Sequence, residues 1–215
     1  MIKVQRKSEP EILKKKAGQW TSKLLAAAAK KEKDKAEIKY RHSQIKQALV
    51  EMFNGKCAYC ESKITHIDYA HIEHYKPKEK FKELCFEWTN LLLACGICNG
   101  AGYKGNKFPD VQEGGPIVNP CEDDPNQHFI FFYDCNARLA TVIEKTGRGT
   151  LTKDLLGLNR DDLRDYRSRQ VDKLFVLQRL ALTDLEAAAL FQEAQMDCAE
   201  YSAFAKVLAN QLPRK

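Results

Sequence analysis

Two Cys-x-x-Cys pairs, Cys57/Cys60 and Cys95/Cys98, constrain this chain more than any other feature of its sequence. A two-residue gap lets both thiolates of a pair reach one metal ion, and two pairs complete a tetrahedral site. Soft sulfur ligands in that geometry favour Zn²⁺. Such a site has no open position for a substrate, so we expect a structural zinc. The alternative is four separate buried thiols.

The other cysteines lack paired spacing, and we expect single buried or surface thiols at Cys85, Cys121, Cys135 and Cys198. The opening residues, MIKVQRKSEP, lack the apolar stretch of a secretory signal, so we expect a cytoplasmic protein with reduced thiols. No apolar run approaches the roughly 20 residues that a membrane span needs. We therefore expect no contact with a membrane.

Positive charge is concentrated at the start of the chain. The net charge of the 215 residues is +6, but residues 1–50 alone hold 14 Lys and Arg against 5 Asp and Glu. A basic arm on a near-neutral body indicates a polyanionic partner, most plausibly nucleic acid. The alternative is a lysine-rich helix that is merely solvated.

We expect residues 1–54 to form a basic N-terminal helical arm. Residues 1–18 read as extended and mobile, because they contain a proline and a lysine run. Residues 20–40 have high helix propensity from their Ala, Leu, Lys and Glu content. A further helix is expected over residues 44–53, with Ser43 as its N-cap.

The middle of the chain divides into two further parts. Residues 55–112 are rich in Cys, His, Gly and Asn and read as a segment that metal holds together, with residues 91–93 in its core. Residues 113–150 contain a turn-rich connector. Two β-prone runs around "DCNAR" (134–138) then predict a hairpin.

The last part, residues 151–215, is expected to be helical. Asn159 or Asp161 can start one helix, Thr183 can cap the next, and the stretch YSAFAKVLANQL predicts a third.

The stretch AHIEHYKPK, between the two cysteine pairs, carries the next set of reactive residues. Glu73 and His74 are adjacent, so on a regular strand they would point to opposite faces. At a strand end or a bulge they can converge on one site. Asn99 directly follows Cys98, so a zinc ion that fixes this cysteine also fixes the direction of Asn99.

Four elements in this order carry a resemblance. A Cys-x-x-Cys pair, "EHYKP", the Asn-Leu at 90–91 and "CGICN" together resemble the HNH endonuclease family in its zinc-stapled form, over roughly residues 55–110. The resemblance implies an α+β fold, in which a zinc-stapled ββα-metal core carries N-terminal and C-terminal helices.

A narrower resemblance extends over most of the chain. The stretches VQRKSEPEILKKKAGQWTSKL, YRHSQIKQALVEMFNGKCAYCES, VNPCEDDP and LLGLNRDDLRDYR resemble the PtuB nuclease subunits of Septu anti-phage systems, which also occur with some retrons. This implies a nucleic acid as substrate, with DNA favoured over RNA, and a PtuA-like ATPase subunit as partner, with retron components as possible further partners.

The resemblance also implies roles for single residues. His74 corresponds to the general base and Glu73 to a ligand of the catalytic metal. Asn99 corresponds to the second metal ligand, and Asn90 to the residue that braces the loop and orients the histidine. His71 stays open between a further ligand, a substrate contact and a structural histidine.

These residue types suit phosphodiester hydrolysis. A neutral imidazole, with an ordinary pKa of about 6.5, can take a proton from water at neutral pH. Carboxylate and amide oxygens suit Mg²⁺ or Mn²⁺. Many family members have Asp where Glu73 stands, which would move the metal slightly farther out.

Lysines near the motif are candidates for contacts with flanking phosphates, and the alternative is solvated charge. The turn CNGAGYKGNKFP is longer than the usual lysine-containing turn, so either lysine in it can face the phosphate. The candidates are Lys76, Lys78, Lys80, Lys104 and Lys107.

The sequence thus predicts a metal-dependent HNH endonuclease that cuts DNA as the effector of an anti-phage system with an ATPase subunit. One alternative is a zinc-stapled nucleic-acid-binding module without catalysis. Another is a subunit whose helices dock an ATPase while its core is inactive. "EHYKP" together with Asn99 favours the enzyme, because a pure binding module has no need for an acid–base pair beside a fixed asparagine.

Overall fold

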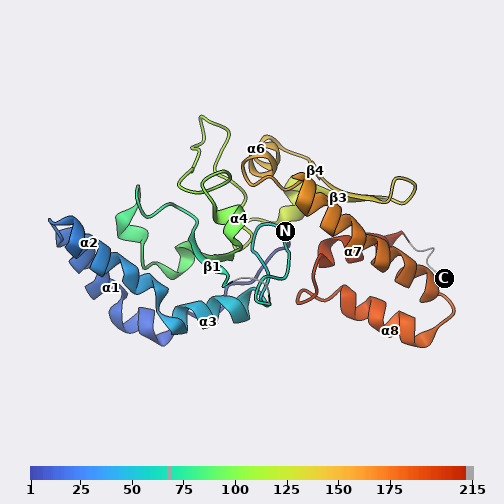
Figure 1. Cartoon of the computed structure of the whole chain (residues 1–215), viewed down its shortest axis with the longest axis horizontal. Coiled ribbons are helices and arrows are strands. Elements are labelled where there is room, and N and C mark those ends of the chain that lie inside the picture. The colour runs from blue at the N-terminus through green and yellow to red at the C-terminus, as the bar shows by residue number, and fades with distance from the viewer. Residues whose placement is uncertain (67–68, 212–215) are drawn as a thin grey trace.

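The computed structural model describes residues 1–66 and 69–211 and has an elongated outline, with N-terminal helices at one end and C-terminal helices at the other (Figure 1). Among these residues no helix is long and apolar enough to cross a membrane. The elements, in chain order, are α1 (Glu11–Ala26), α2 (Lys30–Glu37), η1 (Ile38–Arg41), α3 (Ser43–Met52), β1 (His71–His74), η2 (Lys82–Leu84), η3 (Trp88–Asn90), β2 (Leu91–Ala94), α4 (Gly96–Asn99), α5 (Pro125–His128), β3 (Phe129–Asp134), β4 (Leu139–Glu144), α6 (Gly147–Leu155), α7 (Asp161–Leu180), α8 (Leu185–Ala194) and α9 (Ser202–Asn210).

The first ten residues are extended, as expected, but they are anchored on the core. The Arg6 guanidinium donates hydrogen bonds to the carbonyls of Trp88, Thr89 and Leu91 at 2.6, 2.9 and 3.1 Å. The prediction that this extended part reaches residue 18 is wrong, because α1 begins directly after Pro10. Proline suits a helix start, and the lysine run that follows it has good helix propensity.

The single helix expected over residues 20–40 is instead divided. Helix α1 ends at Ala26, Ala29 is extended, and α2 packs back against α1. Propensity cannot reveal this break, since alanine favours helix on both sides of it. Helix α3 forms where expected, but its N-cap is His42, whose Nδ1 accepts a hydrogen bond from the Gln44 amide at 3.2 Å.

The central unit is a ββα arrangement. Strands β1 and β2 pair antiparallel, with His71 opposite Ala94 and His74 opposite Leu91, and α4 follows β2 directly. All of β2 is buried, which confirms the prediction that residues 91–93 lie in the core. The unit joins its neighbours in one continuous apolar core, so apolar packing holds this segment, which the sequence led us to expect metal to hold together.

The predicted hairpin is confirmed. Strands β3 and β4 pair antiparallel around the turn at residues 135–138, and α7 packs on β4, α8 and α9. The three expected C-terminal helices are present, but Asp184 caps α8 in place of Thr183, with its carboxylate accepting from the Ala187 amide at 2.8 Å. Helix α7 begins at Asp161, one of the two predicted starts.

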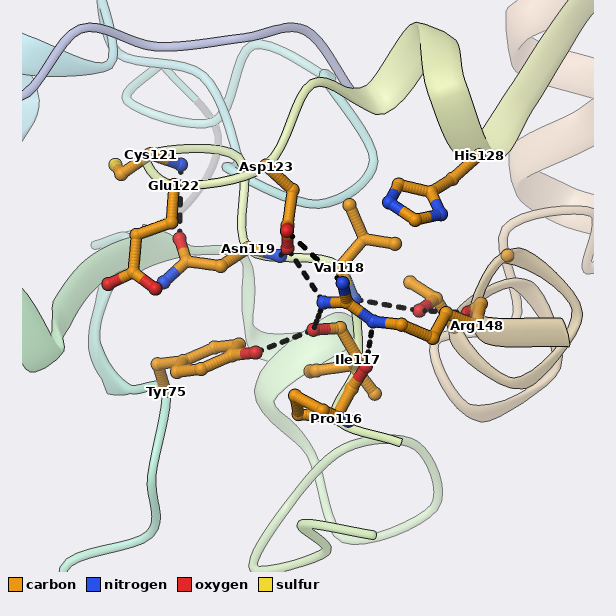
Figure 2. Close-up of polar contacts among 12 residues, drawn as sticks. Tyr75, Pro116, Ile117, Val118, Asn119, Cys121, Glu122, Asp123, His128 and Arg148 are labelled. Carbon is orange, nitrogen blue, oxygen red and sulfur yellow. Dashed lines mark hydrogen bonds and ion pairs between the residues drawn. The ribbon is translucent and has the colours of Figure 1, made fainter. Parts of the chain in front are cut away.

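A polar network ties the connector to the central unit (Figure 2). Arg148, on α6, donates through Nε to the Pro116 carbonyl at 2.8 Å and through Nη2 to the Asp123 carboxylate at 2.8 Å. The Tyr75 hydroxyl donates to the Ile117 carbonyl at 2.5 Å. Because Tyr75 follows the last residue of β1, this network supports the end of that strand.

Candidate active site and zinc centre

The four cysteines of the two pairs form one cluster. Their sulfur atoms all lie within 4.8 Å of one another, and the Cys60 and Cys95 sulfurs are 4.0 Å apart. None of the four is in a disulfide. The alternative of four separate thiols is therefore wrong, and the donor set fits a structural Zn²⁺. Of the unpaired cysteines, Cys85 is buried.

The sequence did not predict one neighbour of this cluster. Arg160, just before α7, donates through Nη1 to the Cys98 sulfur at 3.7 Å. Its guanidinium also lies over the Tyr103 ring, 5.2 Å from the centroid. A positive charge stabilises a cluster of thiolates, so this contact couples the C-terminal half to the cysteine cluster. No spacing rule connects an arginine this far along the chain to the cysteines.

Glu73, His74 and Asn99 line one cavity of about 170 Å³. The first two lie at the end of β1, and Asn99 is the last residue of α4. At the strand end, adjacent side chains converge on one site, which is the arrangement that makes an acid–histidine pair useful. Tyr40, from η1, also lines the cavity, and sequence spacing provided no signal for it.

His74 is buried and held from two sides. Its Nε2 lies 2.9 Å from the carbonyl oxygen of Cys85, and the Tyr40 ring meets it edge-on with centroids 4.7 Å apart. Burial lowers the pKa of His74 to about 4. The ring is therefore neutral at pH 7. A carbonyl only accepts hydrogen bonds, so Nε2 carries the proton and Nδ1 is the basic nitrogen.

Glu73 has a buried cation as its partner. Its carboxylate forms an ion pair with the Lys104 ammonium and accepts a hydrogen bond from the Tyr59 hydroxyl at 3.4 Å. Burial raises the pKa of Glu73, and the Lys104 charge opposes that rise. The Lys104 Nζ also donates to the His74 carbonyl at 2.9 Å.

The burial of Lys104 corrects one expectation. Its side chain is 0% exposed, so its ammonium faces Glu73 inside the protein and not a flanking phosphate at the surface. Lys107, the other candidate in that turn, is exposed.

Asn90 contacts the loop that follows β1. Its side chain accepts from the Lys76 amide at 2.7 Å and donates to the carbonyls of Lys76 and Leu84 at 3.0 and 3.1 Å. These bonds connect the two ends of the segment 76–84 through Asn90. The geometry suits the bracing role that the resemblance implies.

The remaining candidates are more peripheral. His71 is exposed at the start of β1, and it lines a neighbouring cleft but not the cavity of His74. Lys78 pairs with Glu37 and Glu79 at 2.6 and 2.8 Å. Lys76 is half-buried, with its Nζ 5.9 Å from the centroid of a phenylalanine ring, and Lys80 is exposed.

Comparison with known proteins agrees with this geometry. The family described as HNH endonuclease matches residues 57–104. A Septu protein PtuB of Bacillus mycoides (strain KBAB4) is 31% identical, over 86% of this chain and 71% of that relative. The chain belongs to the HNH endonuclease family. The ββα unit and its cysteine cluster are therefore an HNH core flanked by helices.

Other relatives of this HNH protein point the same way. A Septu protein PtuB of Bacillus thuringiensis is 38% identical, over 55% of this chain and 42% of that relative. A retron Vc95 putative HNH endonuclease of Vibrio cholerae serotype O1 biovar El Tor is 29% identical, over 56% and 60% respectively. The chain is thus similar to Septu proteins along most of its length and to a retron protein over about half of it.

Proposed function

We propose that this chain is a metal-dependent endonuclease that hydrolyses phosphodiester bonds of DNA. The observation that carries the proposal is the convergence of Glu73, His74 and Asn99 on one small cavity beside a four-cysteine cluster. A structural cluster alone would not require a neutral buried histidine next to two oxygen ligands.

His74 is the general base in this proposal. The Cys85 carbonyl fixes its orientation through Nε2 and leaves Nδ1 to take the proton of the attacking water. Tyr40 packs on the ring and limits its rotation. Asn90 keeps the loop after β1 in place, so the base holds its position relative to the scissile phosphate.

Glu73 and Asn99 are the residues that would hold a catalytic ion. Their carboxylate and amide oxygens are hard donors on one cavity, which suits Mg²⁺ or Mn²⁺. Such an ion supplies charge stabilisation at the non-bridging and leaving oxygens of the phosphate. Lys104 orients the Glu73 carboxylate and favours its ionised form.

The substrate class follows from charge and family. Residues 1–50 hold 14 Lys and Arg against 5 Asp and Glu. Tyr40, which belongs to this basic arm, lines the cavity of His74. A cationic arm beside a phosphodiesterase site favours a nucleic acid, and membership in the HNH family favours DNA. Lys80 and Lys107 are exposed and available for flanking phosphates.

We further propose that the chain serves as the effector nuclease of an anti-phage system and acts with a PtuA-like ATPase subunit. The similarity to two Septu PtuB proteins supports this role, and the similarity to a retron protein supports retron components as alternative partners. Co-purification of the chain with a PtuA-like ATPase subunit tests the partnership. Failure to co-purify from cells that express both would contradict it.

Plasmid cleavage tests the nuclease. Zinc-loaded protein, alone and with the ATPase subunit, should nick supercoiled plasmid when Mg²⁺ or Mn²⁺ is added and stop when the ion is chelated. Glu73→Gln and Asn99→Ala should raise the ion concentration that half-maximal cleavage requires. Intact plasmid under every one of these conditions would contradict the proposal, and DNA binding without cleavage would favour a binding module.

A further inference from the structure

A second cleft adjoins the cavity of His74. It has a volume of about 580 Å³ and lies between η1, the start of α3 and the start of β1. It shares Tyr40, Ile72 and Asn99 with the cavity of His74. A ligand that occupies both therefore passes directly over the candidate metal ligand Asn99.

The lining of this cleft has the chemistry of a nucleotide site. It contains the cations Arg41 and Lys46, the imidazole of His71 and the ring of Tyr69, and no Asp or Glu lines it in the part of the chain that the structure describes. The Tyr69 side chain is 95% exposed. Cations attract phosphate, and an exposed aromatic face is a stacking surface for any base.

The cleft is in contact with His74, the proposed general base, through Tyr40. The Arg41 guanidinium lies 5.6 Å from the centroid of the Tyr40 ring, and its Nε donates to the Tyr40 hydroxyl at 3.1 Å. The same Tyr40 ring meets His74 edge-on. The Lys46 ammonium, also in the lining, donates to the Tyr69 carbonyl and so ties Tyr69 to α3.

We infer that this cleft binds an unpaired nucleotide next to the scissile phosphodiester, with Arg41 and Lys46 on its phosphate and Tyr69 stacked on its base. The inference rests on the proposed nuclease function and narrows its substrate class. A base within a duplex already stacks on its neighbours and offers no free face to Tyr69. The enzyme therefore prefers DNA that is single-stranded or unpaired at the cleavage point.

Fluorescence anisotropy of a labelled oligonucleotide tests this preference without cleavage. The zinc-loaded chain (residues 1–215), without added Mg²⁺ or Mn²⁺, should bind the single strand more tightly than the duplex of the same sequence. Tyr69→Ala should weaken single-strand binding on the order of tenfold, and Tyr69→Phe should retain it, because the phenyl ring keeps the stacking face.

Salt dependence tests the two cations. Arg41→Gln with Lys46→Gln should lower the slope of log affinity against log salt by roughly 0.7 for each phosphate that the variant no longer neutralises. The matched control is Lys173→Gln with Arg179→Gln, which removes the same charge from exposed positions on α7 (Figure 1). The control should keep the slope of the wild type.

Two results would overturn the inference. One is equal affinity for single strand and duplex, with Tyr69→Ala indistinguishable from wild type. The other is a double variant Arg41→Gln, Lys46→Gln that changes the slope of log affinity against log salt no more than the α7 control variant does. Plasmid cleavage by the wild type is measured separately. If the wild type cleaves plasmid but Tyr69→Ala binds single strands as tightly as the wild type, the proposed nuclease function stands and only the inferred nucleotide-binding cleft is refuted.

Discussion

Glu73 and Lys104 form an ion pair that is almost fully withdrawn from water, at 3% and 0% exposure. Removing two charges from solvent is expensive, and their attraction only about offsets that cost. The pair is therefore poorly explained as a stabilising device. It is better explained by the site, because the Lys104 charge opposes the rise that burial causes in the pKa of Glu73 and orients its carboxylate.

Replacing both partners of this pair should cost less than the summed costs of replacing each partner alone. Lys104→Met leaves a buried carboxylate without a cation, and we expect a loss of about 3–5 kcal/mol in the free energy of unfolding. The double variant Glu73→Gln, Lys104→Met should lose less than the sum of the two single losses. Denaturant unfolding of the zinc-loaded proteins measures the cycle, and strictly additive losses would contradict the coupling.

At this scale the sequence predicted which residues gather around the cavity better than it predicted their environment. Glu73 and His74 lie between the two cysteine pairs and Asn99 directly follows Cys98, so a shared site was expected, and the three residues line one cavity. The burial of Lys104 and the contact of Tyr40 could not be predicted. Both depend on side chains that tertiary packing brings to the site from outside the motif.

Among the elements, the turn before α7 contacts the four-cysteine cluster in a way that depends on one glycine. Gly157 has a φ of +55°, and a Cβ there would lie 2.1 Å from the Tyr103 ring. This close approach places Arg160, three residues later, against Tyr103 and the Cys98 sulfur. The turn thus packs the C-terminal helices onto the segment that carries Asn99.

We expect Gly157→Ala to destabilise the protein and to speed zinc loss. The left-handed backbone costs a residue with a Cβ about 1–2 kcal/mol, and the clash with Tyr103 adds to this. Gly102→Ala is the control, because nothing lies within 4 Å of a Cβ at that position. Thermal unfolding and the rate of zinc release to a chromogenic chelator measure both effects. Equal behaviour of the two variants would contradict this account of the turn.

The zinc centre should be a folding element and not part of the chemistry. Cys95→Ser removes one of four ligands, so we expect less bound zinc and loss of structure in residues 55–112. Cys198→Ser, at an exposed thiol outside the cluster, should retain the wild-type zinc content. Metal analysis and circular dichroism check this, and a soluble Cys95→Ser protein with full zinc content would contradict it.

Over the whole molecule, the HNH core lies between the basic arm and the C-terminal helices (Figure 1). The hairpin and helices α3, α7, α8 and α9 were predictable, since they have strong local patterns. The break of the arm at residues 27–29 was not, because it comes from α2 packing on α1 and not from local propensity. Likewise, the anchoring of the first ten residues requires carbonyls of η3 and β2 that no local pattern reveals.

The most direct test of the central claim is the cleavage rate of His74→Ala against that of the wild type. Both are assayed zinc-loaded with Mg²⁺ on supercoiled plasmid, alone and with the ATPase subunit. His66→Ala, at an exposed histidine, is the control. A general base contributes about 10²–10⁴-fold, so His74→Ala should be slower by that factor at unchanged zinc content, and His66→Ala should match the wild type. Equal cleavage by His74→Ala and the wild type would contradict the claim that this cavity is the nuclease site.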